Sequence, residues 1–492
     1  MDAWFDLRPA VADDGHARAP VSGRPHAAPR SRGEAAADET ARSNPCLGEL
    51  LGALSHALDL AEGQPPGHAL RSCWIAQQVG RAIGLGTAAL HDLFHATLLK
   101  DAGGSGDAAR LGALFLADDR AFKRERRRGG AGLPGRIGVL LRQVGAGARP
   151  AARLRALANA LRHGGEIERE LGEARCARGA EVARQLRLGE DVVDALQALD
   201  ERWDGSGLPQ GLAGKDIPLY ARIALLAQAV DVRHAASGPQ AAREEVARLA
   251  GRWFDPRLAD AFAVLSRDAG FWRGLTADGL LQRVLETAPP EASQPVADDV
   301  LDEIAAAFGE IVDAKSPWTA GHSARVALVA DHLARRLGLD HPSRRWLRRG
   351  ALLHDLGMLG VSNRILDKPG PLDASEWRAV RRHALQTEQI LGRVGSLASL
   401  ARIAGAHHER LDGCGYPRGL GGRHIRLETR ILTTADVFDA LTADRPWRPA
   451  LPAGQALQAL RERVGTAIDP DCFAALAESL ASLGDTGAFR GV

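Results

Sequence analysis

The chain contains very little lysine, tyrosine and methionine: five, two and two residues among 492. It also lacks an excess of either charge, since 63 Lys and Arg face 61 Asp and Glu. A strongly basic surface is what gives binders of nucleic acid polymers most of their affinity. The near balance of charge therefore excludes that class, and we expect no nucleic acid polymer as partner.

The five cysteines are scattered, and no two of them have the CxxC spacing of a zinc ribbon or a redox motif. This spacing also argues against a disulfide scaffold. No run of 18 uncharged apolar residues occurs, so we expect no membrane span. The N-terminus shows no basic segment followed by an apolar stretch, which argues against a signal peptide. These absences together predict a cytoplasmic protein.

Short runs with period-two alternation are scarce, whereas apolar residues recur at helical spacing from Leu47 onward. This pattern predicts an all-α protein. The length exceeds one ordinary core and suits two or three domains. Residues 1–45 are rich in Ala, Arg, Pro, Gly and Asp, which predicts a disordered tail. The prolines of segment 289–299 predict a linker.

Two parts of the sequence resemble each other, which indicates an internal duplication. The pattern Asp-Gly-x-Gly-x-Pro-x-Gly-Leu begins at Asp204 and again at Asp412, and an Arg follows each Asp after 18 residues. His68 and His322 each follow a glycine and precede an aspartate by 33 residues. Such preserved spacings predict one domain present twice.

The duplication predicts two tandem helical-bundle domains, over residues 46–288 and 300–485. The interval from the aspartate at position 101 or 355 to the Asp-Gly-x-Gly pattern is about 46 residues longer in the first copy than in the second. We therefore expect an insertion around residues 110–170 of the first domain.

Histidines of the second copy fall on apolar helix faces. Val326, Val329 and Leu333 share a helical face with His322, so this histidine is predicted to point toward the core. His354 and Asp355 follow an apolar run and would project about 100° apart on a helix. A lone buried histidine is usually structural, and neither motif identifies a ligand by itself.

The complete set contains five histidines and two aspartates in mainly apolar surroundings: His322, His354, Asp355, His383, His407, His408 and Asp436. Burial of so many imidazoles and carboxylates without a cation would leave charges and polar groups uncompensated. Seven ligands exceed one tetrahedral site and suit two ions that share a carboxylate or solvent bridge. The mixed nitrogen and oxygen donors, without cysteine, favour iron, manganese or nickel over zinc. We therefore predict two divalent transition-metal ions.

The motifs HSARV, HDLG, HHERLDGCGYP and ADVFDALTADRPW occur in this order between about residues 300 and 480. In order and spacing they resemble the HD-GYP family, a branch of the HD-type metal-dependent phosphohydrolases. The resemblance implies an all-helical HD domain, present here in tandem, that hydrolyses cyclic di-GMP to pGpG or GMP. It also implies that the seven residues are metal ligands and that Asp355 lies between the two metals as the catalytic carboxylate. The loop that names the family corresponds to Gly415, Tyr416 and Pro417.

The resemblance further implies a cyclic dinucleotide as substrate. Arg325, Lys368 and Arg410 are the candidate contacts to its phosphate or guanine groups. A diguanylate-cyclase-type or other signalling protein is an expected kind of partner, and a homodimer is left open.

Two positions depart from the family pattern. Met358 stands where the family has a lysine after His-Asp-x-Gly, and the loss of one charge-assisted contact costs roughly 1.5–3 kcal/mol. Trp318 stands where some relatives carry an extra acid for a third metal, which favours two metals. The missing lysine keeps two alternatives open: a catalytically weak or inactive signalling scaffold, and an HD phosphohydrolase for another nucleotide.

The first copy has lost most of the chemistry. Lys100 takes the place of a metal-binding histidine, Leu199 and Asp200 replace the His-His pair, and Gln228 replaces the last aspartate. No counterpart of His383 is evident. We predict a degenerate, regulatory domain in which Lys100 forms a charge pair with its neighbour.

Overall fold

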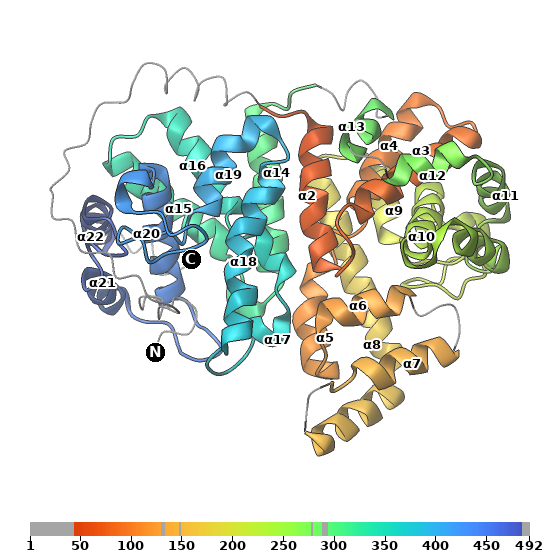
Figure 1. Ribbon diagram of the computed structural model, residues 1–492, viewed down its shortest axis with the longest axis horizontal. Helices are drawn as coiled ribbons and strands as arrows, with labels where there is room; N and C mark the ends of the chain where they lie inside the picture. The colour runs from red at the N-terminus through yellow and green to blue at the C-terminus, as the bar shows by residue number, and fades with distance from the viewer. Residues whose placement is uncertain (1–43, 129–132, 147–148, 277–278, 288–293, 485–492) are drawn as a thin grey trace, which may run out of the picture.

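The computed structural model describes residues 44–128, 133–146, 149–276, 279–287 and 294–484, and the regular elements in these ranges are helices (Figure 1). Within the same ranges, β-bridges occur only as isolated pairs. The all-α prediction is confirmed. The tail predicted over 1–45 falls almost wholly outside the described residues, as does half of the predicted linker. None of the described helices is apolar over a length that could cross a bilayer.

The first domain consists of α-helices with two short 3-10 turns. In chain order they are α2 (Leu47–Ala61), α3 (His68–Ala82), α4 (Thr87–Leu98), η1 (Ser105–Asp107), α5 (Ala108–Phe115), α6 (Asp119–Arg128), α7 (Leu133–Gln143), α8 (Pro150–Gln185), α9 (Glu190–Gln197), η2 (Gly214–Asp216), α10 (Leu219–Leu249), α11 (Pro256–Leu265), α12 (Ala269–Thr276) and α13 (Leu280–Thr287).

The second domain repeats the order of the bundle without the inserted helices. Its elements are α14 (Asp298–Asp313), η4 (Pro317–Thr319), α15 (His322–Arg336), α16 (His341–Leu353), η5 (Leu356–Gly360), α17 (Asn363–Leu366), α18 (Ala374–Leu391), η6 (Gly395–Leu397), α19 (Ala398–Gly405), η7 (Gly422–His424), α20 (Leu427–Thr442), α21 (Ala453–Arg461) and α22 (Pro470–Gly484). Its α18 corresponds to the last part of α8.

The two Gly-His motifs start equivalent helices. α15 packs against α16 and α20 in the second domain, as α3 packs against α4 and α10 in the first. Gly321 and Gly67 cap these helices with φ of 69° and 84°, a left-handed conformation that favours glycine. The sharp entry makes His322 and His68 the first helical residues, and both side chains are buried.

The insertion forms a lobe of its own in the first domain. α5, α6, α7 and the first part of α8 lie together at one end of the bundle (Figure 1). Phe115 and Phe122 stack at 5.1 Å within a small apolar cluster that the lobe contributes. The extra residues therefore build a packed unit rather than a long surface loop.

The two domains share an apolar core. α2 of the first domain packs against η5 and α18 of the second, while α14 of the second packs against η1 and α8 of the first. Leu54 from α2 and Phe308 from α14 are both fully buried in one continuous cluster. Figure 1 shows α2 standing beside α18 and α14 at the centre of the molecule. The reciprocal packing fixes the first domain against the helices that carry the candidate site.

Candidate metal centre

Six elements of the second domain converge on one buried centre. His322 begins α15, His354 and Asp355 join α16 to η5, His383 lies in α18, His407 and His408 follow α19, and Asp436 lies in α20. All are buried except His408, which is partly exposed. The structure thus brings together the seven residues that the sequence singled out.

Asp355 lies at the middle of the group, and its two carboxylate oxygens face different pairs of histidines. Oδ2 lies 3.8 Å from Nε2 of His322 and 3.6 Å from Nε2 of His354. Oδ1 lies 3.3 Å from Nε2 of His383 and 3.7 Å from Nε2 of His407. A carboxylate placed between two sets of nitrogen donors can bridge two cations.

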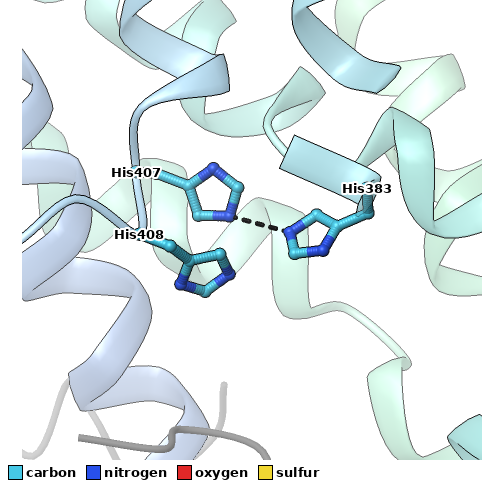
Figure 2. A group of neighbouring side chains, drawn as sticks. All are labelled: His383, His407 and His408. Carbon is cyan, nitrogen blue, oxygen red and sulfur yellow. Dashed lines mark hydrogen bonds between the residues drawn. The ribbon is translucent and has the colours of Figure 1, made fainter. Parts of the chain in front are cut away.

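The remaining two residues each join one side of Asp355. Oδ1 of Asp436 lies 3.3 Å from Nε2 of His322 and 3.7 Å from Nε2 of His354. The His408 ring lies on the other side, with its centroid 4.0 Å from that of His407. Ligand atoms of His383, His407 and His408 all lie within 4.8 Å of one another, a spacing that one ion can span (Figure 2).

Backbone carbonyls fix the orientation of three imidazoles. The Nδ1 atoms of His354, His383 and His407 lie 2.6, 2.6 and 2.5 Å from carbonyl oxygens three residues earlier. A carbonyl only accepts, so each Nδ1 carries the proton and each Nε2 presents its lone pair to the centre. Metal-binding histidines are held in the same way in other proteins.

These lone pairs lack partners among the described residues. Nε2 of His383 lies 3.2 Å from Nε2 of His407 (Figure 2). Because both Nδ1 atoms are protonated, two acceptors face each other at this contact. Nε2 of His354 and Oδ1 of Asp355 are also buried without a hydrogen-bond partner. Buried unpaired acceptors are costly, and cations bound on the two sides of Asp355 would satisfy all four.

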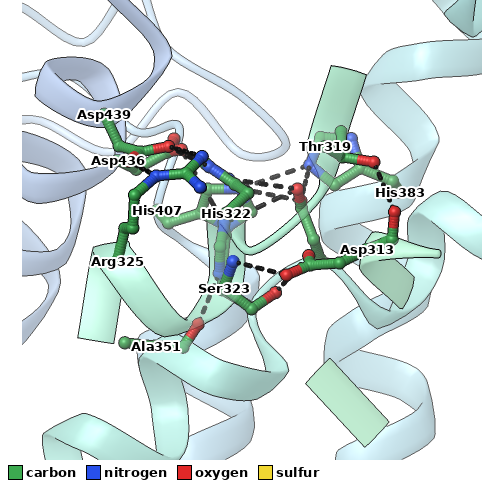
Figure 3. Close-up of polar contacts among 12 residues, drawn as sticks. Asp313, Thr319, His322, Ser323, Arg325, Ala351, His383, His407, Asp436 and Asp439 are labelled. Carbon is green, nitrogen blue, oxygen red and sulfur yellow. Dashed lines mark hydrogen bonds and ion pairs between the residues drawn. The ribbon is translucent and has the colours of Figure 1, made fainter. Parts of the chain in front are cut away.

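His322 is oriented by a carboxylate instead. Its Nδ1 lies 2.7 Å from Oδ2 of Asp439 (Figure 3). Arg325 donates to the same carboxylate, from Nε to Oδ1 at 2.6 Å and from Nη2 to Oδ2 at 3.1 Å. Arg325 therefore supports the carboxylate that holds His322.

The electrostatics of the centre suit a divalent cation. Burial raises the pKa of Asp355 and of Asp436, but the surrounding histidines outweigh it and keep both carboxyl groups below their usual range. Burial lowers the pKa of His383, and it lowers that of His407 well below its ordinary value. The side of the centre with His383 and His407 therefore offers neutral nitrogens beside an ionised oxygen, the donor types that transition metals take from proteins. On the other side, burial opposes protonation of His322 and His354, but the neighbouring aspartates outweigh it and raise the pKa of both, that of His322 to about 10. A cation bound there would displace these protons.

The glycine of the His-Asp-x-Gly motif allows close packing beneath the centre. A Cβ atom on Gly357 would lie 2.1 Å from the carbonyl oxygen of His383. Only glycine leaves room for this approach. The Gly357 amide donates to Thr387 Oγ1 at 2.9 Å, and that hydroxyl donates to the carbonyl of His354 at 2.9 Å.

A cavity opens above the centre. Its wall includes Asp355, Asp436 and several side chains that no metal would need: Lys315, Trp318, Met358, Leu366, Tyr416, Arg445 and Trp447. Arg445 and Lys315 are the cations of this wall; Lys315 is buried almost completely, whereas Arg445 is partly exposed. Arg445 lies within the ADVFDALTADRPW motif, from which no substrate role was predicted for it, and Lys315 lies outside the four motifs.

The three predicted substrate contacts have other positions. Arg325 binds Asp439 and lines a separate groove on the far side of η4. Nζ of Lys368 lies 2.6 Å from Glu376, and Arg410 donates to Asp412 at 2.6 Å. Among the described residues, none of the three lines the cavity above the metal centre. They were predicted from their charge and from their proximity to the motifs in the sequence. In the structure, ion pairs with aspartate or glutamate hold all three side chains.

The loop of Gly415, Tyr416 and Pro417 closes one side of the cavity. The Tyr416 ring stacks on His408 with centroids 4.7 Å apart and an interplanar angle of 29°. Glu409 supports the loop from below, since its carboxylate accepts from the amides of Arg418 and Leu420 at 2.7 Å. The loop thus connects a candidate ligand to the cavity wall.

Two side-chain cations occupy the corresponding centre of the first domain. Lys100 forms the predicted ion pair with Asp101, and its Nζ lies 3.0 Å from Nε2 of His68. Arg127 donates to the other oxygen of Asp101 at 2.6 Å and to Oε1 of Gln228 at 3.1 Å. Asp101 therefore lies between an ammonium and a guanidinium group. These charges leave no room for a metal.

The structure identifies the missing counterpart of His383. A Cβ on Gly103 would lie 1.9 Å from the carbonyl of Arg175, as the equivalent glycine of the second domain approaches His383. Arg175 precedes Asp200 by 25 residues, the spacing between His383 and His408. That interval was available in the sequence. Arg175 forms an ion pair with Asp200, so a third cation replaces a ligand.

A family model described as HD domain matches residues 139–258 and 307–472, one segment in each half of the chain. The 3'3'-cGAMP-specific phosphodiesterase 3 of Vibrio cholerae is 49% identical over 439 residues, which are 89% of this chain and 95% of that protein. A crystal structure of a cyclic GMP-AMP-specific phosphodiesterase of V. cholerae covers 90% of this chain at 45% identity, with 99% of that chain matched and a TM-score of 0.64.

A cyclic di-GMP phosphodiesterase response regulator of Xanthomonas campestris is 36% identical over 179 residues, about a third of this chain (35%) and under half of that protein (46%). The chain belongs to the HD domain family, in its HD-GYP branch and with the domain in tandem. The family resemblance seen in the sequence is confirmed.

Proposed function

We propose that this metal-dependent cyclic dinucleotide phosphodiesterase acts through its second domain and prefers 3'3'-cyclic GMP-AMP. The observation that carries the proposal is the buried group of five histidines and two aspartates at the floor of a cavity with cationic and aromatic walls. The expectation of an enzyme rather than an inactive scaffold is confirmed by relatives of the same class.

The seven residues divide into two sets that would hold two divalent ions. Oδ2 of Asp355 belongs with His322, His354 and Asp436, while Oδ1 belongs with the three histidines of Figure 2. The donor chemistry favours iron, manganese or nickel over zinc. When bound, such ions lower the pKa of a shared water and neutralise charge on a phosphodiester.

The protein's own groups bind and orient the substrate. Arg445 lies partly buried in the cavity wall, where the carboxylates of Asp439, Asp436 and Asp355 contribute to its electrostatic environment. Its guanidinium can donate paired hydrogen bonds to a phosphodiester. Trp318 and Trp447 offer ring faces on which nucleobases can stack. The cavity also restricts water around the reacting phosphate.

The substrate preference rests on the relatives. The V. cholerae enzyme, named as specific for 3'3'-cGAMP, resembles this chain over nearly its whole length, whereas the X. campestris protein named for cyclic di-GMP matches only about a third of this chain. We therefore put 3'3'-cGAMP first and cyclic di-GMP second. The sequence motifs predicted cyclic di-GMP as substrate, with another nucleotide as an alternative.

The first domain, which we place over residues 46–288, would then be regulatory. Its centre holds Lys100 and Arg127 where the second domain, over 300–485, presents metal ligands. We propose that it binds no metal and acts through its contacts with the second domain.

The test compares hydrolysis of both cyclic dinucleotides by the purified, metal-loaded chain. We expect about two ions per chain by elemental analysis and a kcat/KM at least about tenfold higher for 3'3'-cGAMP. Asp355→Ala should lose both the ions and the activity. Failure of the loaded protein to hydrolyse either substrate would refute the function, and a higher kcat/KM for cyclic di-GMP would refute the preference.

A further inference from the structure

One helix of the insertion touches both centres. α6 extends from the cavity wall of the second domain, at Asp119 and Arg120, to the collapsed centre of the first, at Lys123 and Arg127. In Figure 1 it lies at the top of the inserted lobe, above α7. The second domain has no corresponding helix, because the insertion lies in the first domain only.

Asp119 connects two segments of the second domain. Its Oδ2 accepts a hydrogen bond from Lys315 Nζ at 3.0 Å, and its Oδ1 accepts from the backbone amide of Asn363 at 2.9 Å. Asn363 Nδ2 donates in turn to the Lys315 carbonyl at 2.7 Å. The three residues are 0–2% exposed, so water replaces none of these bonds.

Both segments belong to the cavity wall. Lys315 lines the cavity and lies between α14 and η4, next to Ser316 and Trp318. Asn363 begins α17, which ends at the cavity-lining Leu366 and follows the turn that carries Met358. Loss of the Asp119 carboxylate would release two sides of the wall at once.

The remainder of α6 is held by buried ion pairs. Lys123 Nζ lies 2.9 Å from Glu62 Oε1, and Arg127 Nη2 lies 2.7 Å from Glu62 Oε2 and 2.6 Å from Asp101 Oδ1. Arg120 donates to the carbonyl of Leu60 at 2.8 Å and also to that of Gly360. The collapsed centre thus anchors the helix whose first residue reaches the cavity.

From these contacts we infer that Asp119, supplied by the first domain, is a positioning residue for the substrate cavity of the second. It holds Lys315 and the start of α17 in the places that bind a cyclic dinucleotide. The ion pairs of Arg127 with Glu62 and Asp101 in the first domain hold α6, and therefore Asp119, in place. The inference rests on the proposed function, since it assigns a role in that reaction.

The test compares Asp119→Ala with a matched carboxylate of the first domain. Asp255 is also buried and also accepts from one cation and one backbone amide, Arg222 at 2.7 Å and Arg257 at 2.9 Å. It lies at the start of α11, whose Leu258 and Phe262 belong to a second apolar cluster formed by residues of the first domain. Asp255→Ala should therefore lower Tm without changing the cavity.

We expect Asp119→Ala to raise KM by about tenfold with kcat changed less than about twofold, because the wall binds substrate but takes no part in the chemistry. Asp119→Asn keeps an acceptor for the Asn363 amide and should give a smaller rise. Hydrogen exchange should increase in peptides covering 313–319 and 356–366. Asp255→Ala should leave KM and these exchange rates at wild-type values.

The inference is overturned if Asp119→Ala and Asp119→Asn lower Tm but leave KM and the exchange of both peptides unchanged. It is also overturned if Asp255→Ala raises KM equally, since that would indicate general destabilisation. Should Asp119→Ala fail to fold, Asp119→Asn decides the outcome. A wild-type chain without turnover would count against the proposed function, whereas the exchange measurement needs no turnover and still tests the contact.

Discussion

Replacement of Asp439 by asparagine separates the support of a metal ligand from the support of the fold. The carboxylate is 4% exposed and holds Nδ1 of His322 at 2.7 Å, together with two nitrogens of Arg325. Asparagine keeps the size of the side chain but presents one oxygen and one amide. It can satisfy His322 or Arg325, but it cannot satisfy both.

The size of the effect follows from the bonds that are lost. A buried hydrogen bond to a charged group contributes roughly 1.5–3 kcal/mol, so Asp439→Asn should lower the free energy of unfolding by about that amount. A residue that orients a metal-binding histidine typically changes metal affinity by about ten- to a hundredfold. Both losses should appear together in this variant.

The first domain provides the control. Asp231 holds His68 Nδ1 at 2.6 Å and Arg71 Nε at 2.6 Å, which is the same arrangement around a centre without metal. Asp231→Asn should therefore cost similar stability but leave metal content and activity unchanged. Metal affinity would be measured by competition with a chelator, and stability by urea unfolding.

Equal metal affinities in wild type and Asp439→Asn would refute the reasoning, because the orientation of His322 would then not depend on the carboxylate. A loss of metal in Asp231→Asn would refute it differently, since it would place an ion in the first domain. A stability loss confined to one variant would show that the two His-Asp-Arg groups are not equivalent.

Three further results are expected. Arg445→Met should raise KM by about ten- to a hundredfold through loss of a charge-assisted phosphate contact, measured by steady-state kinetics with metal content as control. Met358→Lys, which restores the family lysine in the cavity wall, should lower KM; an unchanged or higher KM would show that the contact is not missed. Burial lowers the pKa of His95 to about 3. This folded-state pKa lies below the unfolded value near 6.5, so the contribution of His95 to the free energy of unfolding should be complete above pH 6.5. It should fall by about 1.4 kcal/mol per pH unit between pH 6.5 and pH 3. His95→Leu should remove this part of the pH dependence, as measured by urea unfolding at several pH values.

The helical fold and its duplication were predictable because each is written in local patterns. Apolar spacing identified the helix that carries His322, and the structure shows that this helix begins at His322. The position of the insertion followed from intervals along the chain. The packing of α2 against η5 and α18 was not predictable, since a helix face shows that it is buried but not which surface covers it.

The candidate ligands were predictable for the same reason, because seven histidines and aspartates at fixed intervals identify a family. The cavity wall was not. Lys315 and Asp119 are 196 residues apart in the sequence and meet only because two domains share a core. Arg325 and Arg410 have the right charge but belong to ion pairs that the sequence does not specify. The charge of an arginine makes it a candidate for phosphate binding, but its ion-pair partner in the fold determines whether it is available for that role.

The two centres solve one electrostatic problem in different ways. Each domain buries an aspartate, Asp101 or Asp355, within a scaffold that also fixes a histidine through a carboxylate and an arginine. A buried carboxylate must be neutralised, whichever cation does so. In the second domain the positive charge can come from protons on His322 and His354 or from bound ions, and both can be exchanged. In the first domain the side chains of Lys100 and Arg127 supply the positive charge, and this charge cannot dissociate from the chain. That substitution removes the chemistry but keeps the fold, and through Arg127 it anchors α6, whose first residue, Asp119, binds Lys315 of the second domain.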